Sequence, residues 1–219
     1  MVSIEIDSVT KRYRRVTALE EISIAIEGGM VHGLLGPNGS GKTTLIRLIA
    51  GLERPTEGQI DSSTDDIGVC FQQPCFFPSL TVDENISIFA DLADEPVEDN
   101  WIDELCENIR LSPVRHRTAD QLSGGFAKKL DLVLALLKKP AILLLDEPVA
   151  DIDDESRSDI RSFIEMYQDE DRIVLLSTHD IEGFSPILDQ ITYIMDGRKR
   201  FTGGPDQFDE WLHELETRK

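Results

Sequence analysis

The spacing of hydrophobic and polar positions changes along the chain, and each change predicts a different element. Residues 4–9 and 22–26 alternate apolar with polar positions, which predicts two half-buried strands. Residues 31–35 form a short apolar run typical of a buried strand, and residues 43–52 carry apolar positions at helical spacing. The order in this part of the chain is therefore strand, loop and helix.

Further along, short apolar runs alternate with helical patterns. Buried strands are predicted at residues 67–71, 142–145, 173–176 and 191–195. Helices are predicted at residues 82–92, 101–109, 125–137, 156–166, 181–188 and 207–216. Alternating strands and helices predict an α/β fold with a largely parallel sheet. The consecutive helices between about 80 and 137 interrupt this alternation, which indicates a helical lobe inserted into the fold.

The charge of the chain limits its partners. It contains 42 acidic and 22 basic residues, a formal net charge of −20. This balance argues against general affinity for nucleic acid or anionic lipid, because phosphate binding relies on Lys and Arg. Two interpretations remain, an ordinary acidic cytosolic protein and a protein adapted to high salt, where ions screen self-repulsion. We prefer the second.

Length and apolar content indicate one soluble domain. The chain has 219 residues, no low-complexity linker and no apolar run near the roughly 20 residues that span a bilayer. Its N-terminus lacks the basic and apolar blocks of a signal peptide. Cys70, Cys75 and Cys106 are odd in number and have no metal-like spacing, so we expect reduced thiols in a cytoplasm.

A glycine-rich stretch, GPNGSGKT, lies between a predicted strand and a predicted helix. Gly36, Gly41, Lys42 and Thr43 match the phosphate-binding loop pattern G-x-x-x-x-G-K-[ST]. Glycines let successive backbone N–H groups face phosphate oxygens at a helix N-terminus. We expect Lys42 to contact the β- and γ-phosphates of a nucleotide and Thr43 to offer its hydroxyl to Mg²⁺.

A phosphate-binding loop also needs acidic partners, and the stretch ILLLDEP supplies them. Asp146 and Glu147 directly follow four apolar residues that predict a strand. We expect Asp146 to hold Mg²⁺ through water and Glu147 to act as general base toward an attacking water. Beside the glycine-rich loop, this interpretation is favoured over a strand that simply ends in acidic residues.

Five motifs follow one another in the order GPNGSGKTT, CFQQP, LSGGF, ILLLDEP and STHD. With these motifs the chain resembles the ATP-binding subunit of ABC transporters, and the resemblance extends from Tyr13 to about Phe201. The resemblance implies a single domain over residues 1–219. Its P-loop NTPase core, residues 1–75 and 139–219, would have a mainly parallel sheet and an N-terminal antiparallel β part. The helical lobe would cover about residues 76–138.

The resemblance also implies a nucleotide site shared by two subunits that close head-to-tail around two ATP. ATP would contact the following residues of one subunit: Tyr13, Gly36, Pro37, Asn38, Gly39, Ser40, Gly41, Lys42, Thr43 and Thr44. The second subunit would contribute Ser123, Gly124 and Gly125, and a helix N-terminus suits a γ-phosphate. By itself, LSGG is typical of a serine cap followed by a flexible turn.

Three further residues carry roles implied by the resemblance. Gln72 would reach Mg²⁺ and the attacking water, and it is preferred over Gln73 because it directly follows the apolar run. His179 would contact the γ-phosphate, and Asp153 would lie at the dimer interface. The expected catalytic residues are thus Lys42, Gln72, Glu147 and His179, and the expected metal contacts are Thr43, Gln72 and Asp146.

Two positions depart from the family pattern. Phe126 stands where glutamine is usual after LSGG, which leaves the contact with the second subunit open. The interface loop reads Ala150, Asp151, Ile152, Asp153, whereas a small residue usually precedes the leucine and aspartate.

The expected function is ATP hydrolysis coupled to a membrane permease, with the subunit on the cytoplasmic face of the cell membrane. The stretch LVLALL lacks the arginine common in importer subunits, and together with ENISIFADL it resembles exporter-type subunits. Export is therefore expected, and import is the alternative. A soluble ABC ATPase acting on a protein assembly also remains open. The stretch 74–89, which includes Phe76 and Phe77, would form part of the permease docking surface or of the lobe core. No nucleic acid partner is expected.

Overall fold

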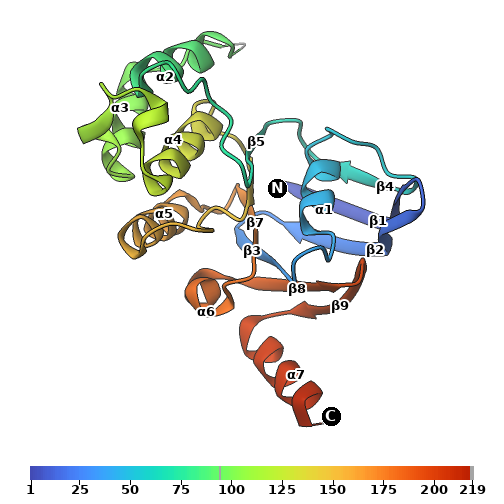
Figure 1. Cartoon of the computed structure of the whole chain (residues 1–219). Helices are drawn as coiled ribbons and strands as arrows, with labels where there is room; N and C mark the ends of the chain where they lie inside the picture. The colour runs from blue at the N-terminus through green and yellow to red at the C-terminus, as the bar shows by residue number, and fades with distance from the viewer. Residues whose placement is uncertain (94, 218–219) are drawn as a thin grey trace.

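The computed structural model describes residues 1–93 and 95–217 and contains two β-sheets and a helical lobe (Figure 1). The smaller sheet is antiparallel, in the order β2-β1-β4. Its strands are β1 (Ser3–Tyr13), β2 (Val16–Glu27) and β4 (Glu57–Ser62). Apolar residues alternate with polar ones along β1 and β2, so one face of this sheet is buried.

The larger sheet has the order β5-β6-β7-β3-β8-β9, and all its neighbouring strands are parallel except the pair β8 and β9. Its strands are β3 (Met30–Leu35), β5 (Ile67–Cys70), β6 (Ile142–Asp146), β7 (Ile173–Thr178), β8 (Gln190–Met195) and β9 (Arg198–Gly203). The central strands β6 and β7 are buried along their whole length. The expected α/β fold with a mainly parallel sheet and an N-terminal antiparallel part is confirmed.

Two hydrophobic cores hold the layers together. Helix α1 (Lys42–Ile49) packs Leu45 and Ile46 into a core that contains residues of both sheets, including Ile4 and Leu144. The second core joins the opposite face of the larger sheet to the lobe helices α2 (Val82–Asp91), α3 (Asp99–Asn108) and α4 (Gly124–Leu136). It also includes residues of α5 (Asp154–Tyr167), α6 (Ile181–Phe184) and α7 (Pro205–Thr217). Short 3₁₀ turns lie at Ser112–Val114, Ala119–Gln121 and Ser185–Ile187.

The helical lobe stands to one side of the larger sheet, at the upper left of Figure 1. Helix α2 begins with a capping box, in which the Thr81 hydroxyl accepts from the backbone N–H of Glu84 and the Glu84 carboxylate accepts from that of Thr81. Helix α4 connects the lobe to the sheet, because its buried residues, including Leu132 and Val133, belong to the second core.

One sequence expectation was wrong, and two strands were missed. Strands β4 and β9 were not predicted, because both are polar edge strands without an alternating buried face. The helix expected over residues 181–188 is only the four-residue α6 followed by a 3₁₀ turn. Pro186 removes a backbone donor within this turn and prevents a longer helix.

A buried imidazole lies on the central strand β3. His32 is fully buried, and its Nε2 is 2.9 Å from the Thr192 hydroxyl, whereas its Nδ1 has no hydrogen-bond partner in the part of the chain that the structure describes. Burial disfavours the charged imidazolium and lowers the pKa of His32 from 6.5 to about 4.

This histidine makes stability depend on pH. Because its pKa is lower in the folded than in the unfolded chain, the unfolded state binds more protons between these values. The contribution of neutral His32 to the free energy of unfolding is complete above pH 6.5 and is lost as pH falls toward 4. We expect about 2 kcal/mol of the free energy of unfolding to be lost between about pH 7 and about pH 5 through this residue. In urea unfolding, His32→Gln should lose less of its free energy of unfolding over this pH range than the parent chain does. The exposed control His116→Gln should lose as much as the parent. Equal losses in the parent and in His32→Gln would contradict this.

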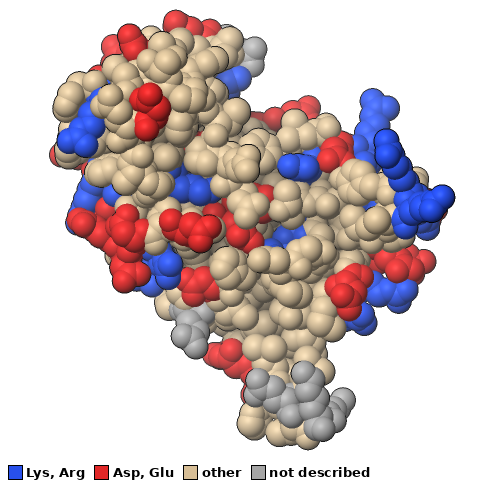
Figure 2. Space-filling model, viewed as in Figure 1, with Lys and Arg blue, Asp and Glu red and all other residues tan. Residues whose placement is uncertain are grey.

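The surface charges are unevenly distributed. Figure 2 shows Lys and Arg gathered at the right edge, over the turn between β1 and β2, where the chain reads KRYRR. Asp and Glu gather at the left, around the position of α5 in Figure 1. Among the described residues, no helix has the length and apolar character needed to cross a membrane.

Candidate functional site

The glycine-rich loop joins the carboxyl end of β3 to the N-terminus of α1, as the sequence predicted. Gly41 immediately precedes the helix with φ 111°, and a Cβ there would lie 2.5 Å from a methyl of Leu19 and 2.7 Å from the Ala18 carbonyl. Only glycine fits both the left-handed backbone and this close approach. The loop can therefore turn tightly and present N–H groups at the helix end.

Lys42 is buried at the first position of α1. Its Nζ donates to the carbonyls of Gly36 at 2.8 Å and Pro37 at 3.2 Å. Burial lowers the pKa of Lys42, and the negative charges of Glu147 and Asp146 oppose this shift. The ammonium is thus held inside the loop, where a phosphate would meet it.

A depression of about 450 Å³ opens at this loop. Its lining combines loop residues with residues from β2, from the segment after β5 and from the end of β6; it includes Thr17, Asn38, Gly39, Gly41, Lys42, Thr43, Thr44, Gln72 and Glu147. A second depression of about 720 Å³ shares Thr43 and Gln72 and also contains Asp146. The two hollows place most of the predicted loop, metal and base residues around one space.

Asp146 ends the buried strand β6 and is 1% exposed. Its Oδ1 accepts from the Ser177 hydroxyl at 2.6 Å, whereas its Oδ2 has no hydrogen-bond partner among the described residues. A buried carboxylate oxygen without a donor is costly unless a cation or water satisfies it. Oxygen ligands are those that Mg²⁺ prefers, so Asp146 and the neighbouring Thr43 fit a magnesium site.

Glu147 is the point on which the other predicted catalytic residues converge. The Gln72 amide nitrogen donates to Glu147 Oε2 at 3.4 Å. His179 Nδ1 lies 3.6 Å and Lys42 Nζ lies 3.9 Å from Glu147 Oε1. Four segments of the chain thus bring an amide, an imidazole and an ammonium to one buried carboxylate.

The backbone of Glu147 is also unusual. Its φ is 50°, a left-handed conformation that a residue with a Cβ rarely adopts, and its N–H donates to the carbonyl and hydroxyl of Ser177. Such conformations cost free energy and are concentrated at functional sites. Ser177 therefore supports both adjacent carboxylates, a role that sequence analysis missed although the residue begins the motif STHD.

The structure separates the two neighbouring glutamines. Gln72 lines both depressions and contacts Glu147, whereas Gln73 is exposed and lines only the larger one. This geometry favours Gln72 for the proposed role.

Tyr13 lies at the end of β1 and is 40% exposed. Its hydroxyl donates to Glu53, and the same carboxylate pairs with Lys11 at 3.0 Å. Lys11 Nζ also lies 5.0 Å from the centre of the Tyr13 ring. Glu53 was not predicted, because an acidic residue after a helix has no local signal; it fixes the tyrosine from across the fold.

The LSGG residues lie away from both depressions. Ser123 caps α4, its hydroxyl accepting from the N–H of Phe126 at 3.4 Å, and neither Ser123 nor the glycines line the two hollows described. Within one chain they are therefore not joined to the phosphate-binding loop, as the head-to-tail interpretation requires.

Gly125 is needed for packing inside the chain. A Cβ there would lie 2.1 Å from the Ser156 hydroxyl and 2.7 Å from the Asp153 carboxylate, whereas one on Gly124 would meet nothing closer than 3.6 Å. Asp153 caps α5, because its carboxylate accepts from the backbone N–H and hydroxyl of Ser156. The two predicted interface segments thus pack directly on each other.

Phe126, the departure from the family pattern, is partly buried and packs against the second core. Lys129 Nζ lies 5.1 Å from the centre of its ring and also pairs with Asp159 at 2.6 Å. The aromatic ring thus forms a contact with the α4–α5 pair that an amide could not reproduce.

A phosphate-binding loop between β3 and α1, with buried carboxylates at the end of β6, defines a P-loop nucleotide-binding domain. The family model described as ABC transporter matches residues 19–150, and the chain belongs to this family as its nucleotide-binding ATPase domain.

Relatives and solved structures agree with this assignment. The sulfate/thiosulfate import ATP-binding protein CysA of Synechococcus elongatus is 36% identical over 217 residues, which cover 93% of this chain and 63% of that protein. The chain therefore spans less than two thirds of this relative. The ADP conformation of the ATP-binding cassette MJ1267 is 25% identical with a TM-score of 0.85, covering 99% of this chain and 96% of that one. The dimeric bacterial ABC transporter cassette MJ0796 is 25% identical with a TM-score of 0.82, covering 92% and 98%.

The relatives' names bear on the direction of transport. Export was expected from the stretch LVLALL, but the sequence relative from Synechococcus is named as an import protein. The comparisons thus favour import, the alternative interpretation, over export.

Proposed function

We propose that this chain binds ATP with Mg²⁺, hydrolyses it as one half of a head-to-tail dimer, and drives import through a membrane permease. The observation that carries the proposal is the convergence of Gln72, His179 and Lys42 on Glu147, beside the unpartnered Oδ2 of Asp146. The import names of the relatives support the direction, and the dimeric cassette supports the assembly.

In the proposed reaction, the chain supplies position and charge. The N–H groups of the loop and the ammonium of Lys42 bind the phosphates, once Lys42 leaves the Gly36 and Pro37 carbonyls. Tyr13 offers an aromatic face to the adenine. Thr43, Asp146 and Gln72 would hold Mg²⁺, which would neutralise charge on the phosphates.

Glu147 accepts a proton from the attacking water. Its position within reach of the Gln72 amide and the His179 imidazole suits this role, because Gln72 orients the water and His179 contacts the γ-phosphate. Ser123, Gly124 and Gly125 of the second subunit complete the site at the N-terminus of α4, and Asp153 lies beside them.

Hydrolysis by the purified chain tests the first part of the proposal. We expect phosphate release from ATP that requires Mg²⁺ and disappears in Lys42→Ala, because the phosphates lose their buried cation. Metal removal by a chelator should stop release reversibly. Release that persists in Lys42→Ala would contradict the site.

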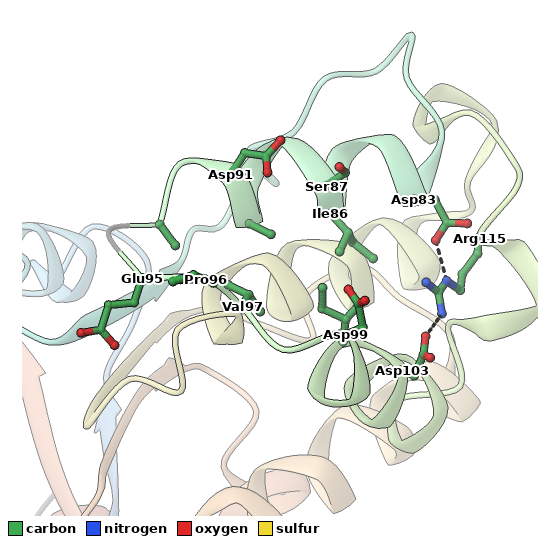
Figure 3. A pocket seen from close by; sticks show the side chains of 13 residues that line it. Asp83, Ile86, Ser87, Asp91, Glu95, Pro96, Val97, Asp99, Asp103 and Arg115 are labelled. Atoms are coloured by element: carbon green, nitrogen blue, oxygen red, sulfur yellow. Dashed lines mark hydrogen bonds and ion pairs between the residues drawn. The ribbon is translucent and has the colours of Figure 1, made fainter.

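The proposed permease docking surface includes a groove in the lobe, with the subunit on the cytoplasmic face of the membrane. The groove, of about 730 Å³, lies between α2 and α3 (Figure 3). Its apolar floor includes Ile86, Val97 and Ile102, and its rim carries the exposed carboxylates of Asp91 and Glu95.

Arg115 crosses this groove and pairs with Asp83 and Asp103, which holds the pKa of Arg115 above its usual range. The remaining carboxylates suit a permease segment with basic and apolar side chains. Phe77 is 48% exposed and packs against Phe89 of α2, with ring centres 6.1 Å apart, whereas Phe76 packs against the core. Only Phe77 therefore remains available for docking.

The comparisons give no support to adaptation to high salt, which is not part of the proposal.

Charge reversal tests the docking and the direction. In pull-down with co-expressed permease subunits, we expect Asp91→Lys with Glu95→Lys to reduce co-purification at least about tenfold, while hydrolysis by the isolated chain persists. Asp61→Lys, on the distant β4, is the matched control. Reconstituted vesicles should accumulate sulfate or thiosulfate in the direction of import; outward transport, or no permease partner, would refute this part.

A further inference from the structure

Two buried charged side chains on α4 contact the segment that carries Gln72. Asp131 is 4% exposed and Lys128 is 6% exposed, among buried apolar neighbours such as Leu130 and Leu132. Neither side chain lines the depressions around the phosphate-binding loop. Buried charges are costly in an apolar core, so their contacts need an explanation.

Asp131 joins the two ends of the segment from residue 70 to residue 75. Its Oδ2 accepts from the thiol of Cys70 at 2.8 Å, at the end of β5. Its Oδ1 accepts from the backbone N–H of Cys75 at 2.7 Å. Burial raises the pKa of Asp131, and these hydrogen bonds oppose the shift. One carboxylate therefore closes a loop of six residues.

Lys128 holds the middle of the same loop. Its Nζ donates to the carbonyl of Phe71 at 3.1 Å and to the carbonyl of Gln72 at 2.5 Å. The backbone of Gln72 is thereby tied to α4, while its side chain donates to Glu147 on the other side. The loop is attached at both ends and at Gln72 itself.

The two residues lie on α4, the helix that Ser123 caps. A displacement of α4, whose N-terminus faces the second subunit in the proposed dimer, would move the backbone of Gln72 through Lys128 and Asp131. We propose that Asp131 and Lys128 are positioning residues that set Gln72 against Glu147 and couple it to the LSGG end of α4. This proposal rests on the proposed ATPase function.

ATP hydrolysis kinetics, measured in the parent chain and in Gln72→Ala, distinguish an effect on the position of Gln72 from a general loss of stability. We expect Asp131→Ala and Lys128→Met to lower kcat about tenfold with the KM for ATP nearly unchanged. Asp131→Asn keeps an oxygen that accepts from the Cys75 N–H, so its kcat should fall less. In a Gln72→Ala background, the same changes should lower kcat no further, because the residue on which they act is absent. An equal fold-loss in both backgrounds, or a loss confined to KM, would overturn the proposal.

Lys129→Met is the matched control. Lys129 lies on the same helix, is 3% exposed and pairs with Asp159 instead of the loop. Its effect on kcat should be the same in the parent and Gln72→Ala backgrounds. Thermal unfolding of every variant identifies any that fail to fold, and Asp131→Asn then serves in place of Asp131→Ala.

Hydrogen exchange gives a readout that does not depend on hydrolysis. Amides of residues 71–75 should exchange faster in Asp131→Asn and Lys128→Met than in the parent chain, but not in Lys129→Met. Unchanged exchange would refute the positioning role of Asp131 and Lys128 even if the parent chain hydrolyses ATP. Absence of hydrolysis in the parent chain would instead refute the proposed function.

Discussion

Replacing Glu147 with glutamine is expected to lower ATP hydrolysis by about 10²- to 10⁴-fold while ATP binding persists. Glutamine has nearly the same size and keeps an oxygen that can accept from Gln72, but it cannot take a proton from water. The loop and Lys42 remain in place, so the phosphates keep their contacts. ATP-bound dimers should therefore accumulate.

Phosphate release and size-exclusion chromatography measure the two halves of this result. Glu165→Gln, an exposed site on α5, is the matched control and should keep its rate within about twofold of the parent. Hydrolysis by Glu147→Gln near the parent rate would remove Glu147 as the general base and leave another group to accept the proton.

Replacing Ser123 with arginine is expected to reduce hydrolysis at least about 100-fold and to leave ATP binding by the same chain intact. ATP binding should persist because Ser123 caps α4 and does not line the hollows at the phosphate-binding loop of its own chain. The arginine would occupy the space that the second subunit's γ-phosphate needs. Ser123→Thr keeps a capping hydroxyl and should retain most activity.

Mixing two inactive chains distinguishes a shared site from local damage. Lys42→Ala disables the phosphate-binding loop, and Ser123→Arg disables the contribution to the other subunit. In a mixed dimer, one of the two sites combines an intact loop with an intact LSGG segment, so hydrolysis should reappear. No recovery in dimers shown by cross-linking to be mixed would mean that Ser123 does not act across the interface.

The sequence predicted the parts of the site that consecutive residues encode. Gly36 to Gly41 form one loop between a strand and a helix, and Lys42 to Thr44 begin that helix. Asp146 ends an apolar strand, and Glu147 follows it directly. Such patterns are local, because a backbone cradle and adjacent carboxylates depend on neighbouring positions. The family resemblance correctly identified the ABC class.

Contacts between distant segments could not be predicted in this way. Asp131 has the pattern of a polar position on a helix, yet it is buried against Cys70 and Cys75. Gly125 was expected to contact ATP of the second subunit, and the structure adds that Ser156 and Asp153 exclude a side chain there. Glu53 reaches Tyr13 only because α1 packs against the antiparallel sheet.

The sequence by itself thus determined the class of the protein, its α/β alternation and the residues of the phosphate-binding loop, because period and motif are properties of neighbouring positions. Only the tertiary structure decided which side chains meet Glu147 and that α4 holds the Gln72 segment, whereas the sequence had already favoured Gln72 over Gln73. These relations depend on how β5, β6, β7 and α4 pack, and packing brings together residues that no local pattern connects.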